Sequence, residues 1–189
     1  MALLETTTIP MGTPCPDFHL PAVDGKSYGL SDFAPAEVLV VLFICNHCPY
    51  VVAIEERMIA LARHFAAGAG GKPVQFVGIC SNDPTDYPDD SFENLQRRWQ
   101  TKNYGFPYLH DLSQQVARSF GAVCTPDIFV YDRSRALAYH GRFDDSWKDP
   151  KKVASQDLRA AIEALLTGAP LAVPQVPGMG CSIKWRAGQ

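Results

Sequence analysis

The sequence feature that most constrains the fold is a run of seven consecutive apolar residues, Val38 to Ile44, followed directly by two cysteines. A continuous apolar run of this kind is typical of a strand buried on both faces, as in a parallel sheet. Cys45 and Cys48 come next, and apolar residues at helical spacing begin after Pro49. The order of strand, thiol pair and helix start predicts a βαβ unit whose chemistry lies at the carboxyl edge of the sheet.

The spacing of the two thiols indicates redox chemistry. A helix N-terminus stabilises a thiolate, so we expect Cys45 to be the more acidic thiol and the nucleophile. Cys48 would lie within bonding reach one turn along and resolve the mixed disulfide. A C-x-x-C pair near a βαβ pattern is typical of a redox motif. The alternatives are a coincidental pair of buried thiols or half of a zinc site.

Length and composition limit the class of protein. With 189 residues the chain is long enough for one domain with a substantial core. We expect that domain to span 1–170 and 171–189 to form a tail packed on it. A net charge of −3 gives no reason to expect nucleic acid or an anionic membrane as a partner. We see no targeting or membrane-spanning segment, so we expect a reducing cytoplasm.

The rest of the chain predicts alternating strands and helices. The first half is expected to contain a hairpin turning at Asp24-Gly25, the strand 38–44, a helix over about 49–65 and a strand over 74–79. A helix over about 91–100, capped by Asp90 and Glu93, and a short strand at 108–109 should follow. The remaining elements are a helix opened by Asp111 and Gln114 and ended by Gly121, a hairpin of 128–131 and 136–140, and a helix capped by Asp149-Pro150 that ends before Gly168. This order predicts an α/β fold with a mixed central sheet, helices on both faces and an N-terminal β-hairpin.

Three groups of residues carry a resemblance to a known family. Pro16 to Leu20 with Asp24-Gly25-Lys26, Phe43 to Pro49, and Gly121 to Pro126 followed by Phe129 to Asp132 resemble motifs of the redoxin (AhpC/TSA-type) branch of the thioredoxin-like superfamily. The resemblance covers roughly 12–166 and implies a three-layer thioredoxin-like sandwich. The ending Gly180 to Trp185 is similar to that of a peroxiredoxin-like subgroup carrying C-N-H-C-P.

The resemblance also implies roles for residues away from the thiol pair. It implies that Pro126 is cis and faces the thiols, and that the backbone of Thr125 pairs with an extended substrate. Two departures from the family pattern stand out. The strand 38–44 lacks the buried aspartate of thioredoxins, and Cys45 takes the place of the peroxiredoxin threonine, although Cys48-Pro49 matches the peroxidatic cysteine and the proline that often follows it.

His47 and three further cysteines are additional site residues to test. A His47 imidazolium would favour a thiolate, whereas the alternative is a solvated loop residue. Cys80 and Cys124 adjoin core strands at the expected site edge, as spare resolving thiols, metal ligands or passive core thiols. Cys181 could be a third redox thiol on a mobile tail, or a docked and inert one. We expect Trp185 to dock that tail.

These observations support one function and two rivals. We expect a thiol–disulfide oxidoreductase, without a cofactor, that exchanges a Cys45–Cys48 disulfide with a partner protein or small disulfide. The first rival is a thiol peroxidase with Cys48 as the peroxidatic residue. The second is a zinc- or partner-binding module that uses Cys45 and Cys48 with Cys80, Cys124 or His47. The sequence predicts no oligomeric state.

Overall fold

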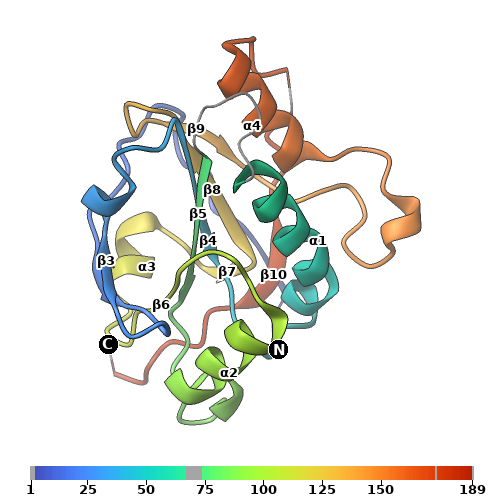
Figure 1. The fold of residues 1–189 in the computed structure, drawn as a ribbon. Coiled ribbons are helices and arrows are strands. Elements are labelled where there is room, and N and C mark those ends of the chain that lie inside the picture. Colours follow the sequence, from blue (N-terminus) through green and yellow to red (C-terminus); the bar gives the residue numbers. More distant parts are fainter. Residues whose placement is uncertain (1–2, 67–73, 173, 189) are drawn as a thin grey trace.

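The computed structural model describes residues 3–66, 74–172 and 174–188, and its centre is a five-stranded mixed sheet. Figure 1 shows the sheet between two layers of other elements. The strand order is β6-β5-β4-β8-β9. Strands β4, β5 and β6 are parallel to one another, β8 is antiparallel to β4, and β9 is antiparallel to β8. The strand bounds are β4 (Val38–Phe43), β5 (Val74–Cys80), β6 (Tyr108–His110), β8 (Asp127–Tyr131) and β9 (Leu137–His140). The predicted mixed sheet is thus confirmed.

The central strand β4 explains why the sheet is covered on both faces. All six of its residues are buried, and their side chains alternate between two apolar clusters. Val38, Val40 and Leu42 join the cluster that contains α1 (Pro49–Ala66) and α4 (Asp157–Thr167). Leu39, Val41 and Phe43 join the cluster that contains α3 (Gln115–Phe120). Each such burial contributes roughly 1.5–3 kcal/mol.

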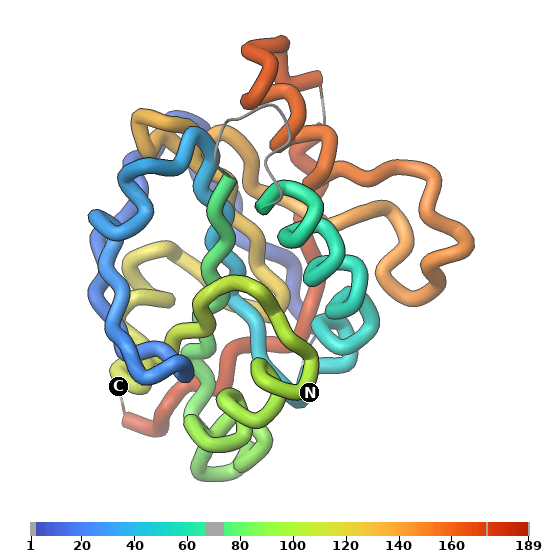
Figure 2. The backbone as a smooth tube through the Cα atoms, viewed as in Figure 1, coloured from blue at the N-terminus to red at the C-terminus, as the bar shows by residue number. Residues whose placement is uncertain are grey.

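The N-terminal hairpin lies on the same face as α3. Its strands are β2 (His19–Pro21) and β3 (Ser27–Gly29), paired antiparallel around Gly25, whose φ is +87°. Leu20 is buried in the α3-side cluster. The predicted hairpin is confirmed, and Figure 2 shows this part of the backbone passing outside α3.

Two predicted helix caps are wrong. Helix α2 spans Phe92–Lys102 and its N-cap is Ser91, whose Oγ accepts the N–H of Asn94, so Asp90 is not the cap. Helix α4 starts at Asp157, because Asp149 instead caps a separate 3-10 turn, Pro150–Lys152. Asp149 bonds to the turn that directly follows it, and Asp90 bonds to another part of the molecule, so neither caps the predicted helix.

A second sheet was not predicted. It joins β1 (Leu3–Glu5), β10 (Met179–Ser182) and β7 (Cys124–Thr125), all antiparallel, in the order β1-β10-β7. Strand β1, near the start of the described chain, and β10, near its end, are therefore paired beside the residues that precede Pro126. None of the helices in the described part of the chain is long and apolar enough to span a membrane.

Candidate active site

The two thiols lie at the junction of β4 and α1, at the carboxyl edge of the central sheet. Cys45 follows the strand and is 2% exposed, whereas Cys48 immediately precedes the helix and is fully buried. The backbone carbonyl of Cys48 accepts the N–H of Val52 at 3.0 Å, which is the first helical hydrogen bond. Cys48 is therefore the residue at the helix N-terminus, and a bend at positions 46–47 separates Cys45 from it.

This placement reverses the predicted acidity of the pair. The pKa of Cys48 is lowered to about 5, first by a hydrogen bond from the Cys45 thiol and, against the effect of burial, by the Val51 N–H and by Cys181. Burial raises the pKa of Cys45 well above its ordinary value, and the bond to Cys48 adds to that rise. The prediction that Cys45 is the more acidic thiol is wrong, first because the Cys45 thiol stabilises the Cys48 thiolate and then because α1 begins after Cys48, so that the Val51 N–H favours that thiolate as well.

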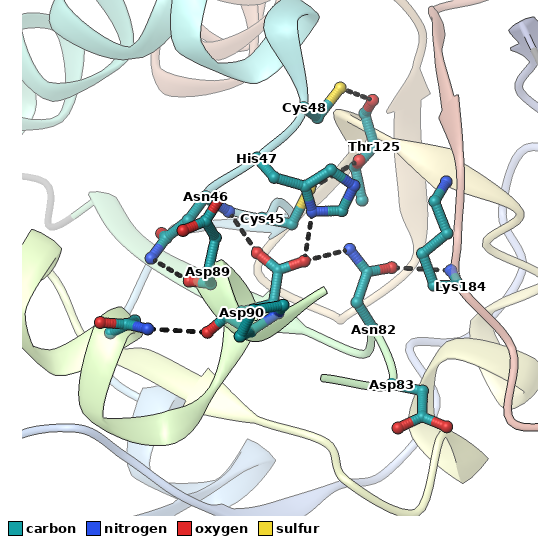
Figure 3. Close-up of polar contacts among 12 residues, drawn as sticks. Cys45, Asn46, His47, Cys48, Asn82, Asp83, Asp89, Asp90, Thr125 and Lys184 are labelled. Carbon is teal, nitrogen blue, oxygen red and sulfur yellow. Dashed lines mark hydrogen bonds and ion pairs between the residues drawn. The ribbon is translucent and has the colours of Figure 1, made fainter. Parts of the chain in front are cut away.

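Thr125 and Pro126 face the thiols, as the resemblance implied. The Thr125–Pro126 peptide bond is cis, which confirms that prediction. In its thiol form Cys48 donates to the Thr125 carbonyl oxygen at 3.0 Å, and Cys45 Sγ shares a hydrogen bond with Thr125 Oγ1 at 3.2 Å. One residue thus contacts both sulfurs, and Figure 3 shows these contacts together.

A buried carboxylate that the sequence analysis had assigned to a helix cap organises the loop between the thiols. Asp90 accepts hydrogen bonds from the Asn46 N–H at 2.7 Å, from Asn82 Nδ2 at 2.8 Å and from His47 at 2.6 Å, as Figure 3 shows. Asp90 is fully buried, so these donors replace the water that its charge loses. The only signal in the sequence was that Ser91 offered an alternative cap next to it.

His47 faces Asp90 and an aromatic ring. Its Nδ1 bonds to Asp90, and its ring stacks on Tyr87 with centroids 4.7 Å apart. The side chain is only 10% exposed, so His47 is not a solvated loop residue. Its Nε2 is buried and has no hydrogen-bond partner among the described residues. The Nζ of Lys184 lies 5.3 Å from the Tyr87 ring centroid and so connects the C-terminal segment to the same stack.

The remaining cysteines differ in their distance from this centre. All six cysteines are free thiols. Burial raises the pKa of Cys80, of Cys124 and of Cys15, which keeps all of them protonated at neutral pH. Cys181, in contrast, lies opposite Thr125, which bonds to Cys48, and its thiol and backbone N–H both lower the pKa of Cys48. The structure therefore brings three thiols together: Cys45, Cys48 and Cys181.

The residues grouped as possible metal ligands differ from the predicted set. Among the described residues, Cys45, His47 and Asp90 place one ligand atom each within 4.8 Å of one another. Cys80 and Cys124, which the zinc hypothesis considered, are not in this group. The His47–Asp90 distance of 2.6 Å is that of a direct hydrogen bond, which accounts for their proximity without an ion.

The C-terminal segment beyond β10 is bound to the body. Ile183 is buried, and its N–H bonds to the Val123 carbonyl at 2.9 Å. Trp185 packs against the α3-side cluster and lies under the Arg118 guanidinium, 4.5 Å from it. The prediction that Trp185 docks this segment is confirmed.

A mixed sheet whose central strand ends at a thiol pair, with a cis-proline opposite, is the arrangement of thioredoxin-like thiol proteins. A family model described as the AhpC/TSA family matches residues 11–140. This match spans more than half of the chain, so the chain belongs to the AhpC/TSA family, the redoxin branch that the sequence motifs indicated. A comparison with curated proteins gave no match.

Solved structures support the same assignment. A hypothetical protein from Sinorhizobium meliloti 1021 is 44% identical, with a TM-score of 0.89, over 97% of this chain and 99% of that one. An uncharacterized conserved protein from Geobacillus kaustophilus is 39% identical, with a TM-score of 0.93, over 100% and 99%. The thioredoxin domain of a thiol-disulfide oxidoreductase from Bacteroides vulgatus is 15% identical, with a TM-score of 0.56, over 70% and 89%. That last likeness concerns the fold alone, which is thioredoxin-like.

Proposed function

We propose that this redoxin is a thiol–disulfide oxidoreductase that uses Cys45 and Cys48 as its dithiol couple. The observation that carries the proposal is that both sulfurs bond to Thr125, beside cis-Pro126 and at the start of α1, with the pKa of Cys48 lowered to about 5, first by the Cys45 thiol. A thiolate is the attacking species in disulfide exchange, and a second thiol in contact with it can resolve the intermediate. Thr125 lies against both sulfurs and would fix their relative position, although its carbonyl accepts from Cys48 only while Cys48 carries its proton.

The reaction assigns roles opposite to those expected from the sequence. The Cys48 thiolate attacks one sulfur of a partner disulfide, whose S–S bond breaks and whose other sulfur leaves as a thiolate. Cys45 then attacks Cys48 Sγ, which forms the Cys45–Cys48 disulfide and releases the second partner thiolate. The proton from Cys45 goes to a released partner thiolate. The partner disulfide is reduced by two electrons, and an external dithiol must restore the couple.

The surroundings of the site favour a substrate with apolar groups next to its disulfide. A cavity of about 130 Å³ borders Pro126. Most of the residues that line it are apolar, among them Tyr50, Trp147 and Met179, and Arg142, Asp144 and Asp145 also line it. The rings of Tyr50 and Trp147 lie 4.3 Å apart at their centroids. A protein or small disulfide with an apolar flank would fit this site better than a charged one. The cytoplasmic location expected from the sequence stays a prediction.

Insulin reduction by dithiothreitol tests the proposal. Wild-type protein should accelerate it, and Cys48→Ser should abolish the acceleration because the nucleophile is lost. Cys45→Ser/Cys181→Ser, which leaves Cys48 without either neighbouring thiol, should trap a mixed disulfide on Cys48. Cys15→Ser is the matched control, since Cys15 is a buried cysteine outside the group of three thiols. Full activity in Cys48→Ser would contradict the proposal.

Peroxide reduction is the second candidate, because the acidic thiol is Cys48, at the position that the first rival requires. The Cys48 thiolate would attack one peroxide oxygen, the O–O bond would break, and the other oxygen would leave as water or an alcohol. The sulfenic acid left on Cys48 would then condense with the Cys45 thiol to a disulfide and water. Cys45 offers only a weak donor to polarise the O–O bond. We expect slow peroxide consumption, even in Cys45→Ser, which restores a hydroxyl. Fast consumption with sulfenic acid trapped on Cys48 would make the protein a peroxidase.

A further inference from the structure

The C-terminal strand β10 lies along the loop that precedes the cis-proline. It pairs antiparallel with β7, so that Cys181 is opposite Thr125 and Ser182 is opposite Cys124. Thr125 is also the residue whose carbonyl accepts the Cys48 thiol at 3.0 Å. Figure 1 shows β10 between β7 and the start of α1. The chain's own strand therefore occupies the backbone edge next to the thiols.

A glycine permits this close approach. A Cβ on Gly180 would lie 2.0 Å from the Thr125 carbonyl oxygen and 2.5 Å from its carbon, and both are backbone atoms. Any other residue would push β10 away from β7. An extended segment that adds to an exposed strand edge is a common way for a protein to hold a peptide. Here β10 is held in that way within the same chain.

The pairing places the Cys181 thiol on the acidic cysteine. Cys181 is 3% exposed and lies opposite Thr125, whose carbonyl oxygen is 3.0 Å from Cys48 Sγ, and its thiol and backbone N–H lower the pKa of Cys48. On its other side β10 pairs with β1, with Leu3 opposite Cys181. The contact is thus held by strands on both sides of β10 rather than by a single side chain. Cys45, Cys48 and Cys181 belong to one buried cluster and all lie against Thr125, so either of the other two thiols can attack Cys48.

We propose that Cys181 is a third redox thiol that forms a disulfide with Cys48, and that β10 is held beside β7 as a substrate strand would be. This inference rests on the proposed function. In the step, Cys181 Sγ attacks Cys48 Sγ of the Cys45–Cys48 disulfide, the Cys45–Cys48 bond breaks, and the Cys48–Cys181 bond forms. Cys45 leaves as a thiolate and takes the proton that Cys181 lost. No electrons enter or leave, so the oxidised protein exchanges between two disulfide isomers.

Peptide mapping after oxidation distinguishes the two isomers. Trypsin leaves Cys45 and Cys48 on one peptide, 27–57, and Cys181 on another, 160–184. A disulfide between these two peptides is therefore diagnostic. Cys45→Ser oxidised with diamide, quenched in acid and digested without reductant should give the linked pair, with loss of both the Cys48 and the Cys181 thiol to labelling. Wild type given one equivalent of diamide should give the same pair beside the internal 27–57 disulfide.

The controls separate this inference from the function on which it rests. Cys45→Ser/Cys181→Ser should lose the linked pair, and Cys45→Ser/Cys15→Ser should keep it. Reduction of insulin by wild type without any 27–57 to 160–184 linkage, in wild type or in Cys45→Ser, would overturn the inference alone. A link from Cys48 to Cys124 in place of Cys181 would also overturn it. Linkage without insulin reduction would overturn the proposed function, and with it the catalytic role of Cys181.

Discussion

At the scale of single residues, the acidity of a thiol pair depends on which sulfur receives the hydrogen-bond donors. Cys45 and Cys48 are chemically identical and three positions apart. Helix α1 begins after Cys48, so the Val51 N–H donates to Cys48, while Cys45 is deeply buried with a raised pKa. A spacing rule for C-x-x-C pairs assumes that the helix begins at the first cysteine. Here it begins at the second.

The first prediction concerns the pH dependence of Cys48. Thiolate absorbance in the ultraviolet should appear as the pH rises through about 5, because the pKa of Cys48 is lowered to that value from 9.0. Below that pH Cys48 is protonated and the absorbance is lost. Cys48→Ala should remove this step, and Cys45→Ala should move it to higher pH by removing the largest stabilising hydrogen bond.

Cys15→Ala is the control for that titration. Burial raises the pKa of Cys15 to about 12, so its removal should leave the step near pH 5 unchanged. An acid step that persists in Cys48→Ala and vanishes in Cys45→Ala would restore the assignment made from the sequence.

The second prediction concerns Asp90, which accepts three donors from the loops around the thiols. Asp90→Asn replaces a charged acceptor with an amide whose NH₂ group cannot accept. Hydrogen bonds to charged groups contribute roughly 1.5–3 kcal/mol, and we expect the free energy of unfolding in urea to fall by an amount of that order. Asp89→Asn is the matched control, because Asp89 is exposed and its backbone carbonyl contact with Asn46 survives. Equal stability of the two variants would contradict the role given to Asp90.

At the scale of elements, strand β10 determines how accessible the site is. Its residues Gly180 and Cys181 are buried against β7, and Cys48 behind them is fully buried. A substrate that needs the Thr125 backbone would have to compete with a strand already paired there. The strand, rather than the thiol spacing, therefore controls access to Cys48.

The third prediction tests that control. Gly180→Ala places a Cβ 2.0 Å from the Thr125 carbonyl oxygen, so β10 must separate from β7. We expect a lower melting temperature and faster labelling of Cys48 by a thiol reagent, followed by mass spectrometry. Gly188→Ala is the control: its φ is +84°, but nothing lies within 4 Å of the added Cβ, so it has the backbone strain without the clash. Unchanged labelling in Gly180→Ala would show that β10 does not shield Cys48.

At the scale of the whole molecule, both ends of the described chain converge on one edge of the fold. β1 supports β10, β10 covers the thiols, and the segment after β10 bonds to Asn82 and Gln114 on the far side of the site. Lys184, Tyr87 and His47 continue this connection to Asp90. The thiol site is thus enclosed by segments from the start, middle and end of the sequence.

The sequence by itself determined the central sheet and the position of the thiols, because both depend on local patterns. The apolar run Val38–Ile44, the hairpin turn at Asp24-Gly25 and the cis-proline motif at Thr125-Pro126 each occupy a few consecutive residues, and the structure confirms them. The physical signals of the first two, apolar periodicity and turn chemistry, can be read without knowing what lies nearby in space, whereas the cis bond was implied by the family resemblance.

Only the tertiary structure decided which thiol is acidic, what Asp90 binds and where Cys181 lies. Asp90 is 43 residues from His47, and Cys48 is 77 residues from Thr125. A buried carboxylate or thiol takes its partners from whichever donors the packed fold brings within reach, and no local pattern records that choice. The same reason applies to Cys181. A four-residue strand that contains a glycine has no periodic signal in the sequence, and its position is set by its pairing with β1 and β7.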